Sequence, residues 1–445
     1  MTIFLPFYVA ALALLVLELR GVRIGRVWPV PRGPALVWIF LLLAAYAVHL
    51  AIVWYAATAV NTPIAWPAVA PIGVASADVR HPNLVSAALL AIGALESFAL
   101  LGLYRAKPFP VLAALGAAVL IAASLAAPAF ESPDAYAYVG DALLGAHAYS
   151  PPNDNFAGEF VTINRFFPSP MLPAPYGPLW LAVATIATAP FGGLFGKLLA
   201  LRLLGAAAFA ALLAGLRAFG VGPRALAVLA LNPALAAQYV CDAHNDLLAL
   251  ALVVAAAAAI RRTSVVAGTG LAAAAGLVKL PFVVVALPVF ASVRSRAARY
   301  ACAAAAAGIA SLLSWWTGGA AYAHGLAVHV PLSRGALALN LAVALTALLL
   351  LLLALAGARR WRAGVWPIAM MSSYVATWYL PYGIAYALAR RRILAYLAIA
   401  LPLACALVDA KFARWWTVAI VLPLVVAACA FPARGACAAN GVRAA

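Results

Sequence analysis

Long apolar runs, separated by short polar or basic stretches, dominate the 445-residue chain. Most of them are close to the ~20 residues that a straight helix needs to cross a bilayer, and the shorter ones are expected to form tilted pairs or helical hairpins. The pattern therefore predicts an all-α polytopic protein with about 13–15 transmembrane helices. The runs cover residues 3–19, 35–58, 84–104, 108–129, 198–216, 224–240, 246–260, 264–278, 280–293, 300–316, 335–357, 363–378, 379–390, 393–409 and 413–430.

Composition supports this interpretation. Apolar residue types make up 68% of the chain and charged types 9%, whereas soluble domains are about half apolar and a quarter charged. A soluble protein, a disordered chain and a disulfide scaffold are therefore excluded. The five cysteines are scattered without a CxxC motif, so we interpret them as small apolar residues and predict neither a disulfide nor a metal site.

The net charge of +18 comes from 29 basic and 11 acidic residues. In a membrane protein such an excess indicates orientation rather than nucleic-acid binding, because Lys and Arg concentrate in cytoplasmic loops. One orientation places most of the basic clusters in the cytoplasm, with the N-terminus outside and the C-terminus cytoplasmic. No basic residue precedes the first apolar run, so this run does not look like a cleaved signal peptide. The predicted location is the cell membrane.

The run at residues 178–194 breaks this alternation. If it crossed the membrane, Arg217 and Arg224 would lie outside. Its Pro178, Pro190 and glycines favour a re-entrant or interfacial helix, which is tolerated where protein buries it.

Five of the eleven acids lie within residues 131–159, inside the one long polar loop at about 130–177. The predicted topology places this loop outside the membrane, with short juxtamembrane helices in it. Asp134 follows an apolar run closely, so its carboxylate would sit at the membrane surface as a general base. If residues 134–146 are helical, Asp141 shares its face and could orient it. The alternative is a solvated loop with ordinary surface acids.

Two further polar features stand beside apolar runs. One is the sequence DAHND at 242–246, a substrate-site candidate or simply a turn in which Asn245 or Asp246 caps a helix. The other is Lys279 in AAGLVKLPFVVV, which could receive a lipid phosphate or could snorkel to the interface. Arg202 is a weaker case of the same kind.

Several of these segments occur in a recognisable order: SPDAYAYVGDALLGAHAYSP, PAPYGPLW, LALRLLG, LALNPALAAQYVCDAHNDLLALAL and GLVKLPFVVVALP. Over roughly residues 130–290 this order resembles the polyprenol-phosphate-mannose-dependent alpha-1,6-mannosyltransferases of MptA/MptB type, in the GT-C superfamily. The resemblance implies many membrane helices with a catalytic outer loop, and transfer of mannose from a polyprenyl phosphate. It implies that Asp134 is the base, that the HND run lines the sugar pocket, and that Lys279 lies near the donor phosphate. The departure from the family pattern is Cys241-Asp242, where small glycines are expected.

The expected reaction needs one base for the acceptor hydroxyl and cations for the departing phosphate, since a phosphate leaves without a proton. It would invert a beta-linked donor, without a metal or cofactor. The partners are a polyprenyl-phosphate sugar donor, a glycan or glycolipid acceptor and the lipid bilayer, with no nucleic acid. Asp134 and Asp141 are the catalytic candidates. The substrate-binding candidates are Tyr136, Tyr138, Arg165, Tyr176, Arg202, His244, Asn245, Asp246 and Lys279.

Three alternatives remain: a transferase of the same superfamily for another sugar, a lipid or polysaccharide transporter or flippase, and a structural membrane scaffold. Transporters often carry inverted repeats, but neither the acidic loop nor AHND recurs in the second half of the sequence. The predicted division is 1–129 for N-terminal helices, 130–177 for the catalytic loop, 178–300 for core helices and 301–445 for C-terminal helices.

Overall fold

The computed structural model describes residues 33–58, 82–107, 109–127, 132, 134–167, 171–262, 264–328, 377–388 and 391–409. Within these ranges the secondary structure is helical and no strand occurs. The elements are α2 (Ala35–Thr58), α3 (Pro82–Arg105), α4 (Pro110–Ala126), α5 (Asp134–Leu144), η1 (Gly145–Tyr149), η2 (Gly158–Phe160), α6 (Val161–Phe166), α7 (Pro178–Thr188), α8 (Gly193–Phe219), α9 (Pro223–Ala230), α10 (Pro233–Ala236), η3 (Ala237–Cys241), α11 (Asp246–Arg262), α12 (Val265–Val278), α13 (Phe282–Ala286), η4 (Leu287–Ser292), α14 (Arg296–Val328), η6 (Thr377–Tyr382), α17 (Gly383–Ala387) and α18 (Arg391–Asp409).

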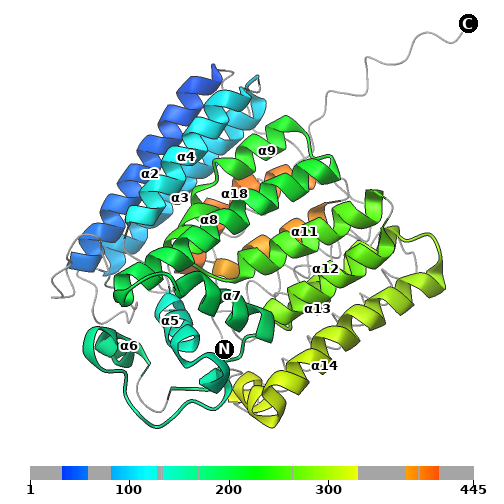
Figure 1. Cartoon of the computed structure of the whole chain (residues 1–445). Coiled ribbons are helices and arrows are strands. Elements are labelled where there is room, and N and C mark those ends of the chain that lie inside the picture. The colour runs from blue at the N-terminus through cyan, green and yellow to red at the C-terminus, as the bar shows by residue number, and fades with distance from the viewer. Residues whose placement is uncertain are drawn as a thin grey trace, which may run out of the picture.

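The long helices form a layered bundle (Figure 1). Helices α2, α3 and α4 lie along one side, and α18 packs against α3 and α9 although it comes from the end of the described chain. Helices α8 and α11 pack together in the middle, and α12 joins α11 to α14 on the far side. The shorter elements α5, α6 and α7 gather at one end of this bundle.

Four helices are long and apolar enough to cross a membrane: Ala35–Tyr55, Leu84–Arg105, Gly193–Phe219 and Arg296–Val328. Pro223–Ala230 and Pro233–Cys241 form a fifth candidate as a broken span, bent by 50°. These helices coincide with predicted runs and confirm an all-α polytopic membrane protein. The predicted runs at 3–19, 335–357 and 413–430 lie outside the described residues, so the count of 13–15 spans stays a prediction.

Helix α7 corresponds to the run predicted to be re-entrant. Its 11 residues extend only about 16 Å at the rise of an α-helix, about half the thickness of a bilayer's hydrocarbon core. This length is consistent with a segment that does not cross, and the topology and the domain division remain predictions.

The break between α9 and α10 is built around Asn232, whose side chain is fully buried. Its Oδ1 accepts from the Leu235 backbone N–H at 3.2 Å and caps α10, and its Nδ2 donates to the Ala398 carbonyl of α18 at 2.7 Å. Pro233 follows at the first helical position, where its missing N–H costs nothing. The side chain therefore satisfies backbone groups that the break would leave unpaired within apolar surroundings.

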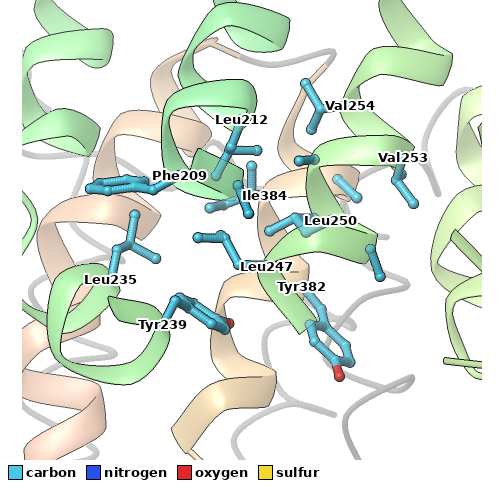
Figure 2. Close-up of a cluster of buried hydrophobic side chains, with 14 of the residues drawn as sticks. Phe209, Leu212, Leu235, Tyr239, Leu247, Leu250, Val253, Val254, Tyr382 and Ile384 are labelled. Carbon is cyan, nitrogen blue, oxygen red and sulfur yellow. The ribbon is translucent and has the colours of Figure 1, made fainter. Parts of the chain in front are cut away.

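The apolar core is continuous from α2 to α18. Figure 2 shows one part of it, where Phe209 and Leu212 of α8 lie beside Leu247 and Leu250 of α11. Tyr382 stands at the edge of this cluster with its hydroxyl turned away from the leucines. The core thus ends at a polar boundary, and the candidate site lies there.

Helix α8 passes close to η3, a π-helical turn, at Gly205. A Cβ atom on Gly205 would lie 2.0 Å from the Tyr239 carbonyl oxygen. We expect Gly205→Ala to lower the free energy of unfolding by about 1–3 kcal/mol or more, because the two backbones must separate. The measurement is thermal unfolding of the purified protein in detergent.

Gly270→Ala in α12 is the matched control, since a Cβ there meets nothing within 4 Å. Alanine is the better helix former, so this variant should be unchanged or stabilised by about 0.5–1 kcal/mol. Equal melting temperatures for the two variants would contradict the close approach.

Candidate active site

Helix α5 carries two of the five acids of residues 131–159, Asp134 and Asp141. It begins at Asp134, whose backbone N–H donates to Ser132 Oγ at 3.1 Å. A carboxylate in the first turn is favoured there by the helix dipole. The condition that residues 134–146 are helical holds: the α-helix ends at Leu144 and continues as the 3₁₀ turn η1.

Asp134 faces His244 across the site. Asp134 Oδ2 lies 3.6 Å from His244 Nδ1, and the side chains are 27% and 0% exposed respectively. This separation is longer than an ordinary hydrogen bond. Because the Asp134 side chain is partly exposed, another molecule can reach its carboxylate, whereas the His244 imidazole lies behind it inside the protein.

Burial favours the neutral form of the His244 imidazole. Burial, and to a lesser extent the positive charge of Lys279, lowers the pKa of His244 well below its usual value. The residue before it, Ala243, has a positive φ of 55°, which is uncommon for a residue other than glycine. Strained backbone of this kind is concentrated at functional sites.

Asp141 lies two turns after Asp134 and is 1% exposed. Among the described residues neither of its carboxyl oxygens has a hydrogen-bond partner. Burial, and then the negative charge of Asp134, raises the pKa of Asp141 well above its usual value. A buried carboxyl that holds its proton is a poor general base.

The raised pKa of Asp141 predicts a pH-dependent stability. Above the unfolded pKa of ~4 the unfolded chain loses a proton that the folded state still holds, so wild-type stability falls as pH rises toward the folded value. An asparagine at this position has no such proton to hold. We expect the melting temperature of Asp141→Asn to rise relative to wild type between about pH 4 and pH 7. A constant difference over this range would show that Asp141 is not buried as a neutral acid.

Asp246 and Lys279 form a buried ion pair. Lys279 Nζ donates to Asp246 Oδ1 at 2.8 Å, and the two side chains are 13% and 0% exposed. The Tyr382 hydroxyl donates to the same oxygen. The other oxygen, Oδ2, has no hydrogen-bond partner among the described residues. Lys279 Nζ also lies 5.9 Å from the centre of the Tyr176 ring.

This geometry changes the interpretation of Lys279. The sequence suggested a lone cation that either receives a phosphate or snorkels to the interface. Its ammonium instead points to Asp246 inside the protein, which contradicts the snorkelling alternative. An ammonium carries three N–H donors, and a contact between Lys279 and a substrate phosphate stays a prediction.

Asn245 is 2% exposed, and in the described part of the chain both atoms of its side-chain amide lack a hydrogen-bond partner. Because the side-chain oxygen accepts from no described backbone N–H, the side chain of Asn245 does not cap α11. A buried amide without partners is costly, and a bound substrate hydroxyl would satisfy it.

The PYGPLW and VKLP segments meet through their backbones. Gly177 N–H donates to the Val278 carbonyl at 3.0 Å, and a Cβ atom on Gly177 would lie 2.1 Å from the Leu277 carbonyl oxygen. Only glycine fits so close an approach. This contact fixes Tyr176 beside Lys279.

The tyrosines of the loop are mostly packing residues. Tyr138 is fully buried, with edge-to-face contacts to Tyr176 and Trp180 at ring-centre distances of 5.1 and 5.0 Å. Tyr136 is 1% exposed. They hold α5 against the bundle, and direct contact with a sugar stays a prediction.

The other two predicted cations are Arg202 and Arg165. Arg202 is 4% exposed and donates to the Leu125 carbonyl at the end of α4 at 3.2 Å. Cys241 Sγ donates to the carbonyl of Ala127, two residues after Leu125, at 3.7 Å. Both therefore anchor the start of the loop. Arg165 belongs to α6, and its side chain lies outside the described residues.

Sequence reasoning missed Tyr382 and the strained Ala243. Tyr382 lies in a run with no motif to mark it. Ala243 is the first residue of AHND, whereas the glycines expected from the family pattern fall at positions 241 and 242. Within the described ranges no group of three or more His, Cys, Asp or Glu side chains could hold a metal ion, and a metal-free reaction stays a prediction.

Comparison with known proteins gives one match. The family model described as alpha-(1->6)-mannopyranosyltransferase, N-terminal domain, matches residues 38–296. The comparison with curated proteins found no match, and neither did the comparison with solved structures. The matched range covers more than half of the chain and contains Asp134, His244, Asp246 and Lys279. The chain therefore belongs to the MptA/MptB family of alpha-(1->6)-mannopyranosyltransferases and is a membrane glycosyltransferase.

Proposed function

We propose that this protein transfers mannose from a polyprenyl-phosphate carrier to a glycan or glycolipid acceptor on the extracytoplasmic face, with inversion, and that Asp134 is the general base. One observation carries this proposal: Asp134 is a partly exposed carboxylate with a buried neutral imidazole 3.6 Å behind it. The exposed part of the carboxylate is open to an acceptor, and His244 is proposed to orient it when the two groups close to hydrogen-bond distance in the substrate complex.

The proposed step is a single displacement. Asp134 takes the proton of the acceptor hydroxyl as the acceptor oxygen attacks C1 of the mannose. The bond between C1 and the phosphate oxygen breaks, and its electron pair leaves on the phosphate. Attack from the face opposite the phosphate turns a beta-linked donor into an alpha-linked product. No acid is needed for the leaving group, which distinguishes the site from the paired carboxylates of a glycosidase.

Lys279 is proposed to stabilise the departing phosphate. A cation aimed at developing negative charge in a poorly hydrated site is among the largest catalytic effects. His244 rather than Asp141 is assigned the orienting role, since Asp141 is buried and holds its proton. Asn245 is assigned to a sugar hydroxyl, because its buried amide has no other described partner.

A donor screen tests the reaction. Membranes that contain the protein are supplied separately with polyprenyl-phosphate mannose, glucose and arabinose, and the linkage of each product is determined by NMR spectroscopy. We expect an alpha-1,6-mannoside from the first donor only. Transfer from another polyprenyl-phosphate sugar alone would assign the protein to a different donor, and transfer from none of the three would contradict the proposed polyprenyl-phosphate carrier.

Site-directed labelling tests the proposed side of the membrane. In a variant whose native cysteines are replaced by serine, Ser150→Cys should react with a membrane-impermeant maleimide added to intact cells. Ser150 is exposed next to η1, so access is not blocked by packing. Labelling only after the cells are opened would place Ser150 on the cytoplasmic side and contradict the proposed topology.

A further inference from the structure

A pocket of about 810 Å³ lies between the end of α11, η4, the start of α14 and α17. It is distant from the candidate site. Helix α11 begins at Asp246 in the site and ends at Arg262 beside the pocket, and its 17 residues extend about 25 Å. That length approaches the thickness of the hydrocarbon core, so the pocket would lie toward the opposite membrane surface if α11 spans the bilayer.

Two arginines line the mouth of this pocket. Arg261 donates to the Phe219 carbonyl at the end of α8, and its guanidinium carbon lies 5.0 Å from the centre of the Phe219 ring. These contacts fix the guanidinium at the pocket while using only part of its five N–H donors. Arg294 lies in the loop before α14 and also lines the pocket, and both arginines are exposed.

The loop that carries Arg294 is fixed by Arg299. Arg299 Nε donates to the Val293 carbonyl at 2.6 Å, and its Nη2 donates to the Arg294 carbonyl at 3.4 Å. Ser295 then caps α14 by accepting from the Ala298 backbone N–H at 3.3 Å. The positive end of the α14 dipole therefore faces the same pocket. Among the described residues that line the pocket, none is acidic.

The inner wall of the pocket is apolar. It consists of buried side chains from three elements, namely Ala257, Ile260, Val289, Ala385 and Leu388. A cationic mouth over an apolar interior matches an amphiphile with an anionic head. Basic pockets between membrane helices are known to bind anionic lipid headgroups.

We propose that this pocket binds an anionic phospholipid, with the phosphate between Arg261 and Arg294 and an acyl chain against the apolar wall. The positive-inside rule assigns this arginine-rich end to the cytoplasmic leaflet, where such lipids are available. The site is therefore separate from the proposed donor site at the other end of α11.

Native mass spectrometry of the purified protein in detergent tests this inference. The probes are phosphatidylglycerol, phosphatidylcholine and sn-glycerol 3-phosphate, each titrated separately. The test variant combines Arg261→Gln and Arg294→Gln. The control combines Arg262→Gln and Arg296→Gln, which removes the same charge from neighbouring positions that do not line the pocket.

We expect wild type and the control to retain one tightly bound phosphatidylglycerol, and the test variant to bind it about tenfold or more weakly, as expected for lost charge-assisted contacts. Equal weakening in both double variants would reduce the effect to general electrostatics and overturn the site. If wild type retained phosphatidylcholine as well as phosphatidylglycerol, the pocket would have no preference for anionic lipids and the proposal would be wrong. Displacement of phosphatidylglycerol by an equal concentration of glycerol phosphate would assign the pocket to a free phosphate instead of a lipid.

Discussion

Replacing Asp134 with asparagine is expected to lower the rate of mannosyl transfer by about 10²–10⁴-fold, the usual contribution of a positioned general base. Asparagine keeps the shape of the side chain but cannot take the acceptor proton. The variant should remain folded, because Asp134 is partly exposed and its side chain lies beyond hydrogen-bond distance of His244. The measurement is turnover with polyprenyl-phosphate mannose, together with the melting temperature in detergent.

Asp154→Asn is the matched control. It changes an exposed acid of the same loop that makes no described contact with His244, and it should keep wild-type turnover. A similar loss in both variants would point to the overall charge of the loop. Near wild-type turnover of Asp134→Asn would assign the base to another group.

The second large effect is expected at Lys279. Lys279→Met keeps the length of the side chain and removes the charge, which leaves Asp246 buried without its cation. Breaking a buried ion pair costs about 3–5 kcal/mol, so the melting temperature should fall. If Lys279 also meets the donor phosphate, kcat/KM should fall by about ten- to a hundredfold, the value of a charge-assisted contact.

A double variant separates these two effects. Asp246→Asn combined with Lys279→Met removes both charges and should recover most of the lost stability. We expect its transfer rate to stay low, because the cation is still missing, whereas Asp246→Asn alone should keep more activity. Recovery of full activity in the double variant would limit Lys279 to pairing with Asp246.

The helices were largely predictable because their causes are local. An apolar run of about twenty residues has few alternatives to a buried or membrane helix, and the runs at 35–58 and 84–104 became α2 and α3 almost unchanged. The run at 224–240 was predicted as one span. It breaks at Asn232 and Pro233, because proline favours a helix start and the asparagine side chain supplies the cap.

The individual residues of the site could be predicted from the sequence, but the contacts between them could not. Asp134, His244, Asp246 and Lys279 were identified from motifs, yet Lys279 read as a lone cation because its partner precedes it by 33 positions. Asp141 could be placed on the face of Asp134, but its burial depends on how α5 packs against α7 and α8. Such contacts follow from the tertiary structure and leave no local signal.

The bond between Tyr382 and Asp246 joins residues 136 positions apart, and it crosses the limit of the family match at residue 296. A fragment that ended at this limit would carry every motif of the family and yet lack one of the two donors to its central carboxylate. The halves of related enzymes should therefore not behave as interchangeable modules. A chimera is expected to work only when its second half brings a phenol to this position, which makes residue 382 the place to examine first when an exchange between relatives fails.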